Sequence, residues 1–336
     1  MTLLENGNWL PLMFAGLIGL AVLIYAILDG YDLGVGILMR SASASEQDNM
    51  IASIGPFWDA NETWLVLGIG LLLVAFPTAY SFVLTKLYLP FTIMIISLMV
   101  RGVAFDFRSK AKINHKKAWN TAFFAGSLLT ALSQGYILGA YILGFQPGVG
   151  AIAFSLLVSM SVAAAYSLIG SAWLIMKSEG ELQKKAVHWS EISLFLTLLG
   201  IILISIATPL LSVRIFHSWF VLPNVVLLAP LLFVTIALII ALHVFLRKLP
   251  KPNDQQCWVP FVATVGIFIL CFHGLAYSFY PYIIPDQETI FDTITSKESL
   301  KFMLIGAGVV FPLLISYTVF AYKVFHGKTR ELTYDL

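Results

Sequence analysis

The chain alternates between long apolar stretches and short polar connections. Nine stretches meet or approach the ~20 residues that a helix needs to cross a hydrocarbon core of about 30 Å. The pattern predicts an all-α integral membrane protein with nine transmembrane helices in a single membrane-embedded domain, residues 1–336. The predicted helices are Trp9–Leu28, Trp64–Tyr80, Leu87–Phe105, Trp119–Phe145, Val149–Met176, Ile192–Val213, Trp219–Leu246, Trp258–Tyr280 and Phe302–Phe325.

Composition supports the same class. Hydrophobic residues make up 59% of the chain and charged residues 11%, whereas about a quarter of a soluble protein is charged. This composition makes membrane lipid the expected surrounding, and the net charge of +2 is too small to indicate a nucleic-acid partner. The first apolar run has no basic flank or small-residue cleavage site before it ends, and we expect it to be retained as a membrane helix.

The distribution of basic residues predicts the orientation. Nine helices divide the connections and termini into two alternating sets, of which one holds 15 of the 20 Lys and Arg residues and the other holds 4. Cytoplasmic loops of membrane proteins are enriched in Lys and Arg. We therefore expect the N-terminus outside the cell and the C-terminus in the cytoplasm.

Ionisable residues gather where the first three apolar stretches meet the predicted cytoplasmic side. Asp29 and Asp32 are three residues apart, as are Asp59 and Glu62, so each pair shares a face if the helix continues through it. Arg101 and Asp106 are five apart and point in different directions, so we expect Arg101 to pair with another helix. These six residues come from the segments "LDGYDLGVG", "GPFWDANETW" and "RGVAFDFR".

Two interpretations of these charges stay open from the residues alone. Each carboxylate can be an ordinary helix-end charge, and Asp59 can cap the second helix. Together with Arg101, however, the set favours a buried polar network, because charges at membrane depth are retained when they pair or line a wet path. The neighbouring Gly30, Gly34 and Gly36 indicate close helix packing rather than a phosphate-binding loop.

The three segments together resemble subunit II of the cytochrome bd-type quinol oxidases, and the wording "WDANETWLVLG" ahead of "FP" is similar to the cyanide-insensitive branch. The motifs occur in the family's order over about the first third of the chain. Beyond Trp119 only the topology supports the resemblance. Ala60 stands where many relatives have Gly, Phe57 where some have His, and Asp106 where many have Glu, which leaves the hydrogen-bond partners of the acids open.

The resemblance implies two four-helix bundles with one additional helix, in a complex of the bacterial cytoplasmic (inner) membrane that oxidises quinol and reduces dioxygen to water. Haem b and haem d, or haem b only, would lie in the partner subunit I, and this chain would bind no cofactor. A small accessory subunit of a single helix is a further expected partner. By motif, Asp59 would be the acid of a proton path from the cytoplasm, with Asp29 beside it and Arg101 in the same region. The resemblance assigns roles to Glu62, Asp32 and Asp106 less directly.

Other functions remain to be weighed. A proton-coupled secondary transporter would use the same acids as an inner gate, although transporters usually place coupling residues near the midplane in related repeats. A scaffold that only stabilises a catalytic partner would need none of the acids for turnover. His243 and His273 are the only histidines inside apolar stretches, and we expect them to be packing residues rather than haem ligands.

Overall fold

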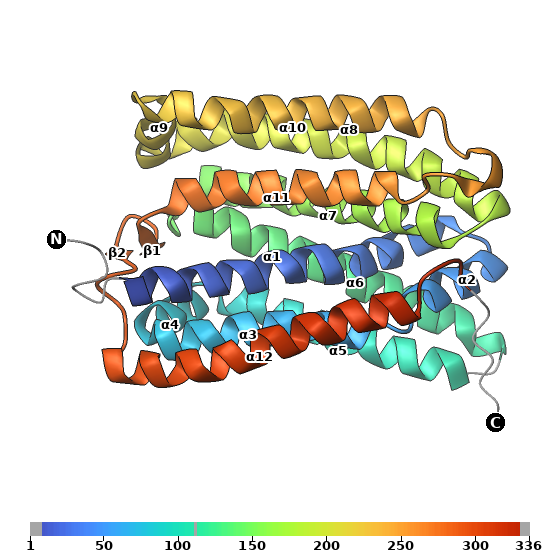
Figure 1. Cartoon of the computed structure of the whole chain (residues 1–336), viewed down its shortest axis with the longest axis horizontal. Helices are drawn as coiled ribbons and strands as arrows, with labels where there is room; N and C mark the ends of the chain where they lie inside the picture. The colour runs from blue at the N-terminus through green and yellow to red at the C-terminus, as the bar shows by residue number, and fades with distance from the viewer. Residues whose placement is uncertain (1–8, 111–112, 330–336) are drawn as a thin grey trace.

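The computed structural model describes residues 9–110 and 113–329, whose long helices run side by side along the longest axis of the molecule (Figure 1). Within those residues, nine helices are long and apolar enough to cross a membrane, which confirms the predicted fold class. They are α1 (Trp9–Leu38), α3 (Trp58–Ala75), α5 (Tyr88–Lys110), α6 (Ile113–Ile142), α7 (Val149–Lys177), α8 (Gly180–Leu211), α10 (Asn224–Leu246), α11 (Val259–Phe279) and α12 (Lys297–Val324).

Shorter elements join these helices. They are the 3₁₀ turns η1 (Met39–Ser41) and η2 (Pro252–Asp254), the helices α2 (Ala44–Ile54), α4 (Pro77–Lys86) and α9 (Val213–Phe220), and the antiparallel strands β1 (Tyr282–Ile284) and β2 (Glu288–Thr289). The two strands form a small ladder between α11 and α12. An ion pair of 2.7 Å from Arg214 Nε to Asp286 Oδ1 ties this ladder to α9.

The spanning helices form two groups of four. In the first group α1 packs against α3 and α6, and α6 packs against α5; in the second, α7, α8, α10 and α11 pack in a ring. Helix α12 lies outside both groups and crosses the front of the first in Figure 1. The two groups also adjoin each other, because α1 and α6 both pack against α7. The division into two four-helix bundles and one additional helix stays a prediction.

The structure corrects the predicted end of the first helix. We predicted that it stops at Leu28, before Asp29, because the apolar run stops there. Instead α1 continues to Leu38, and Asp29 and Asp32 both lie within it and are fully buried. The helix can continue because neighbouring helices supply polar partners for the two carboxyl groups, which the hydropathy of α1 alone does not reveal.

The second and seventh predicted helices are also corrected. The second begins earlier, at Trp58, and breaks at Phe76, after which Pro77 starts the separate helix α4. Proline has no amide hydrogen to continue the preceding helix but is tolerated in the first turn of a new one. Likewise, Trp219 belongs to the short helix α9, and α10 begins after Pro223.

Helices α1 and α7 approach each other closely at two glycines. A Cβ atom built on Gly34 would lie 1.8 Å from the Tyr166 carbonyl oxygen, and one built on Gly170 would lie 2.5 Å from the Gly34 carbonyl carbon. No side chain fits at either position. The packing role predicted for the glycines after Asp29 is therefore confirmed at Gly34.

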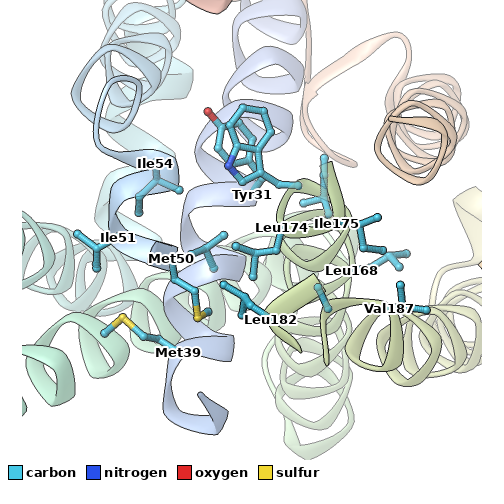
Figure 2. Packing of buried hydrophobic residues seen from close by; sticks show 14 of the residues in the cluster. Tyr31, Met39, Met50, Ile51, Ile54, Leu168, Leu174, Ile175, Leu182 and Val187 are labelled. Atoms are coloured by element: carbon cyan, nitrogen blue, oxygen red, sulfur yellow. The ribbon is translucent and has the colours of Figure 1, made fainter. Parts of the chain in front are cut away.

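A hydrophobic core lies at the end of the molecule where α1 finishes and α2 begins. Figure 2 shows Met39, Met50 and Leu174 packed together with other buried residues where α1, α2 and α7 meet. The amphipathic helix α2 covers this core. It begins with a capping box, in which Ser43 and Glu46 satisfy each other's backbone amides, and the Lys185 ammonium lies 2.8 Å from the Glu46 carboxylate.

Candidate functional site

Four ionisable side chains from three helices meet inside the first group of helices. Asp29 and Asp32 of α1 are fully buried, Arg101 of α5 is 1% exposed, and Glu62 of α3 is 28% exposed. We call these four residues the acid–arginine cluster. Because α1 continues through both aspartates, their three-residue spacing places them on the same side of that helix.

Arg101 is the centre of the cluster. Its Nη2 atom lies 2.6 Å from Asp29 Oδ1 and also donates to Glu62 Oε1. The prediction that Arg101 pairs across helices is confirmed. One guanidinium thus bridges α1, α3 and α5, and this pairing offsets part of the cost of burying charge at membrane depth.

Asn61 joins Asp32 to its surroundings. Its side-chain nitrogen donates to Asp32 Oδ2 at 2.8 Å, to the Tyr31 hydroxyl at 2.9 Å and to the Leu28 carbonyl at 3.3 Å. Sequence reasoning missed Asn61, because a neutral amide between Asp59 and Glu62 carries no charge signal. Its 2% exposure in the structure reveals its role.

Several buried atoms of the cluster have no hydrogen-bond partner among the described residues. They are Asp29 Oδ2, Asp32 Oδ1, Arg101 Nε and Arg101 Nη1. Buried polar atoms of native proteins are nearly always hydrogen-bonded to protein groups or to ordered water. The cluster therefore has free donors and acceptors that can bind water molecules. It also contains three carboxyl groups but one guanidinium group.

A second polar group lies next to Asp29. Tyr25 is one turn earlier on α1 and thus on the same side of that helix as Asp29. Gln134 of α6 donates to the Tyr25 hydroxyl at 2.6 Å and accepts from the Tyr166 hydroxyl of α7 at 2.6 Å. These neutral residues were also missed, because only the fold brings α1, α6 and α7 together.

The other two predicted acids lie away from the buried centre. Asp59 is exposed in the first turn of α3, three residues before Glu62 and thus on the same side of that helix. The N-cap of α3 is Phe57, so Asp59 is not the cap. Asp106 is exposed on α5, whereas the ion pairs of Arg101 within the described residues are with Asp29 and Glu62.

The two histidines inside apolar stretches point outward. His243 on α10 and His273 on α11 are both exposed, and His273 Nδ1 lies 2.7 Å from the Ile269 carbonyl of its own helix. In the described part of the chain, no three His, Cys, Asp or Glu side chains are grouped so that they could hold a metal ion.

Fold and site together define a multi-pass membrane protein with an ionisable cluster buried between its helices. The family model for cytochrome bd terminal oxidase subunit II matches residues 10–325. The chain belongs to this family, and the match extends the resemblance from the first third to nearly the whole chain.

Known proteins give the same assignment. The chain is 25% identical to cytochrome bd ubiquinol oxidase subunit 2 of Bacillus subtilis, over 91% of this chain and 93% of that protein. It is 26% identical to cytochrome bd-I ubiquinol oxidase subunit 2 of Escherichia coli K12, over 94% of each. The fold matches the bd oxidase structure from Geobacillus thermodenitrificans with a TM-score of 0.75 at 19% identity, covering 94% of this chain and 98% of that one.

Family membership has direct consequences. The chain is a subunit of an oxidoreductase complex, a terminal oxidase of the cytochrome bd type, and it resides in a membrane as a multi-pass protein. A subunit II implies a subunit I as its partner.

Proposed function

We propose that the chain is the subunit without haem in a bacterial inner-membrane oxidase that oxidises quinol and reduces dioxygen to water. Its relatives in Bacillus subtilis and Escherichia coli are named as subunits of ubiquinol oxidases, which supports quinol as the reductant. Haem b and haem d, or haem b only, would lie in subunit I, where the redox chemistry takes place. A single-helix accessory subunit and the assembly of subunit I around this chain remain predictions.

Within this complex, the acid–arginine cluster serves as part of a proton uptake path. The observation that carries this proposal is the imbalance of three carboxyl groups against one guanidinium in a buried site. A buried site with excess carboxyl groups favours holding protons, and unpartnered oxygens on Asp29 and Asp32 can exchange them with water.

The path opens along α3. Asp59 is exposed and shares a side of α3 with the partly exposed Glu62, which reaches Arg101 in the cluster. Protons therefore enter at Asp59, exchange with Glu62, Asp29 and Asp32, and pass on to subunit I. Asp106, exposed on α5, remains a predicted outer member of the network.

The orientation proposed from the basic residues gives the path its direction. Arg40 lies in η1, directly after α1, and Arg108 and Lys185 form ion pairs with Asp48 and Glu46 of α2. All three basic residues therefore lie at the end of the molecule where α1 finishes and α2 begins. With this end in the cytoplasm, the N-terminus lies outside and the acid–arginine cluster takes up protons from the cytoplasmic side.

Replacing Asp59 by Asn tests this function. We expect quinol-dependent oxygen consumption of the purified complex to fall at least about tenfold, because a proton carrier is lost. The reduced-minus-oxidised visible spectrum should show unchanged haem content. Glu298→Gln is the matched control, because Glu298 is also an exposed acid in the first turn of a spanning helix, α12.

Two results would contradict the proposal. Wild-type turnover in Asp59→Asn would remove Asp59 from the path, and loss of the haems would indicate an assembly role instead. The match to the oxidase subunit family over residues 10–325 speaks against the proton-coupled transporter considered from the sequence.

A further inference from the structure

A chain of hydrogen bonds leads from the acid–arginine cluster to α12. Asn61 contacts both Asp32 Oδ2 and the Tyr31 hydroxyl, and the Tyr31 hydroxyl lies 2.6 Å from the Tyr322 hydroxyl. Helix α12 lies outside both groups of helices, and only 6% of its most apolar stretch is buried. Through Tyr322, this peripheral helix nevertheless reaches the most deeply buried acids.

The donors and acceptors available give this series of hydrogen bonds a direction. The amide nitrogen of Asn61 can only donate, so the Tyr31 oxygen accepts from it. The hydroxyl hydrogen of Tyr31 is then available for its other neighbour, the Tyr322 oxygen. The Tyr31 hydroxyl and Asp32 Oδ2 both lie within 2.9 Å of the same nitrogen, so a Tyr31 hydrogen donated to Tyr322 points away from the adjacent carboxyl group.

Aromatic packing fixes the two tyrosines. The Tyr31 ring, labelled in Figure 2, stacks on the Trp173 ring with centroids 4.2 Å apart. The Tyr322 ring packs on Phe57 at 4.6 Å and on Trp173 at 5.9 Å. Because rings from α7 and the start of α3 hold both phenols, the contact between their hydroxyl groups does not depend on that hydrogen bond alone.

The chain beyond α12 is also anchored. Lys177, at the end of α7, donates from Nζ to the carbonyl oxygens of Phe325 at 2.6 Å and Gly327 at 3.1 Å. In return, the Thr329 amide donates to the Lys177 carbonyl at 2.8 Å. These bonds attach the end of α12 to α7, one turn beyond Tyr322.

We propose that Tyr322 is a positioning residue for Asp32, acting through Tyr31 and Asn61, and that α12 thereby sets the hydrogen bonding of the acid–arginine cluster. The charged groups that face Asp32 are Asp29, Glu62 and Arg101, while Lys177 lies behind the aromatic rings. The effect on turnover rests on the proposed proton path, whereas the effect on Asp32 does not.

The test compares Tyr322→Phe with Tyr317→Phe in the purified complex. Tyr322→Phe keeps the ring that packs on Phe57 and Trp173 and removes only the hydroxyl group. Tyr317 is on the same helix, is 51% exposed, and provides the matched control. The readout is the set of infrared bands of the Asp32 carboxyl group in the redox difference spectrum, identified as those lost in Asp32→Asn.

We expect Tyr322→Phe to shift these bands and to lower oxygen consumption severalfold at unchanged haem content, with no change in Tyr317→Phe. Tyr31→Phe removes the same link from the other side and should give a shift too, which provides the readout if Tyr322→Phe assembles poorly. Wild-type Asp32 bands in an assembled variant would overturn the proposal. Shifted bands with wild-type turnover would support the positioning role and contradict the proton path.

Discussion

At the scale of single residues, the site depends on how one arginine is shared. Arg101 is bonded to Asp29 and Glu62, and all three side chains lie largely out of reach of solvent. Breaking a buried ion pair is far more costly than the net stabilisation it provides, because the remaining charge stays buried without compensation. Arg101 therefore has a structural role as well as an electrostatic one.

Arg101→Gln should accordingly destabilise the protein by about 3–5 kcal/mol, since it leaves two carboxyl groups without their cation. Thermal unfolding of the purified complex, followed by its haem absorbance, measures the change. Arg101→Lys should retain part of the stability, because Lys keeps the charge but not the planar fork. Adding Asp29→Asn to Arg101→Gln should recover stability; a double variant less stable than Arg101→Gln would contradict this account.

The sequence could predict the charged members of the site but not their neutral partners. Asp29, Asp32 and Arg101 stand out because charges are rare in apolar segments. Asn61, Gln134 and the tyrosines do not stand out in this way, because neutral side chains carry no charge signal. Their roles follow from which helices touch, and that is decided by packing across the whole chain.

At the scale of elements, α1 connects the two groups of helices. It packs on α3 and α6 on one side and on α7 on the other. Close contact with α7 requires a bare backbone at Gly34 and Gly170. The small-xxx-small pattern from Gly30 indicated close packing, but only the structure shows that α7 is the neighbour.

Gly34→Ala should therefore disturb assembly. Its methyl group would collide with the backbone of α7, and overpacking of this kind costs about 1–3 kcal/mol or more. Gly16→Ala on the same helix is the control, because nothing lies within 4 Å of the added Cβ. The yield and the unfolding temperature of the complex should fall for Gly34→Ala alone. Equal values for the two variants would show that α1 and α7 can separate without consequence.

The attachment of α2 gives a prediction that depends on pH. The Lys185 ammonium and the Ser43 backbone amide lower the pKa of Glu46. A lowered pKa contributes stability above the unfolded value and loses it as the pH falls through the folded value. Glu46→Gln should weaken α2 by roughly 0.5–1 kcal/mol at neutral pH.

Amide hydrogen exchange in α2, compared between variant and wild type at each pH, measures this difference. The difference should be present at neutral pH and should shrink as the pH falls below the ordinary glutamate pKa of about 4.3 and through the lowered pKa of folded Glu46. A difference of the same size at both pH values would mean that the Glu46 charge does not hold α2 in place.

Helix boundaries show what limits prediction at this scale. The apolar window located each spanning helix, but α1 and α8 extend well beyond it. The extra turns of α1 carry buried carboxyl groups with partners, and those of α8 carry polar residues such as Glu181 and Lys184. Hydropathy records the part of a helix that lies in lipid, whereas backbone hydrogen bonds continue past it.

At the scale of the whole molecule, the nine spanning helices found in residues 9–110 and 113–329 place the acid–arginine cluster toward one end of the bundle. Composition and hydropathy were sufficient to predict this architecture, and three short motifs were sufficient to indicate the family. The sequence could not predict that Asp59 lies on the exposed side of α3 while Asp29 and Asp32 are enclosed. In the proposed proton path, this separation lets the cluster connect a surface with an interior.

Glu62 is the link in this route, because it is the partly exposed acid that reaches Arg101. The most direct test is the rate of proton uptake from the cytoplasmic side when dioxygen is added to the reduced complex in sealed vesicles, comparing wild type with Glu62→Gln at equal haem content. We predict that uptake and oxygen consumption slow together in the variant. Wild-type proton uptake in a fully assembled Glu62→Gln complex would contradict it.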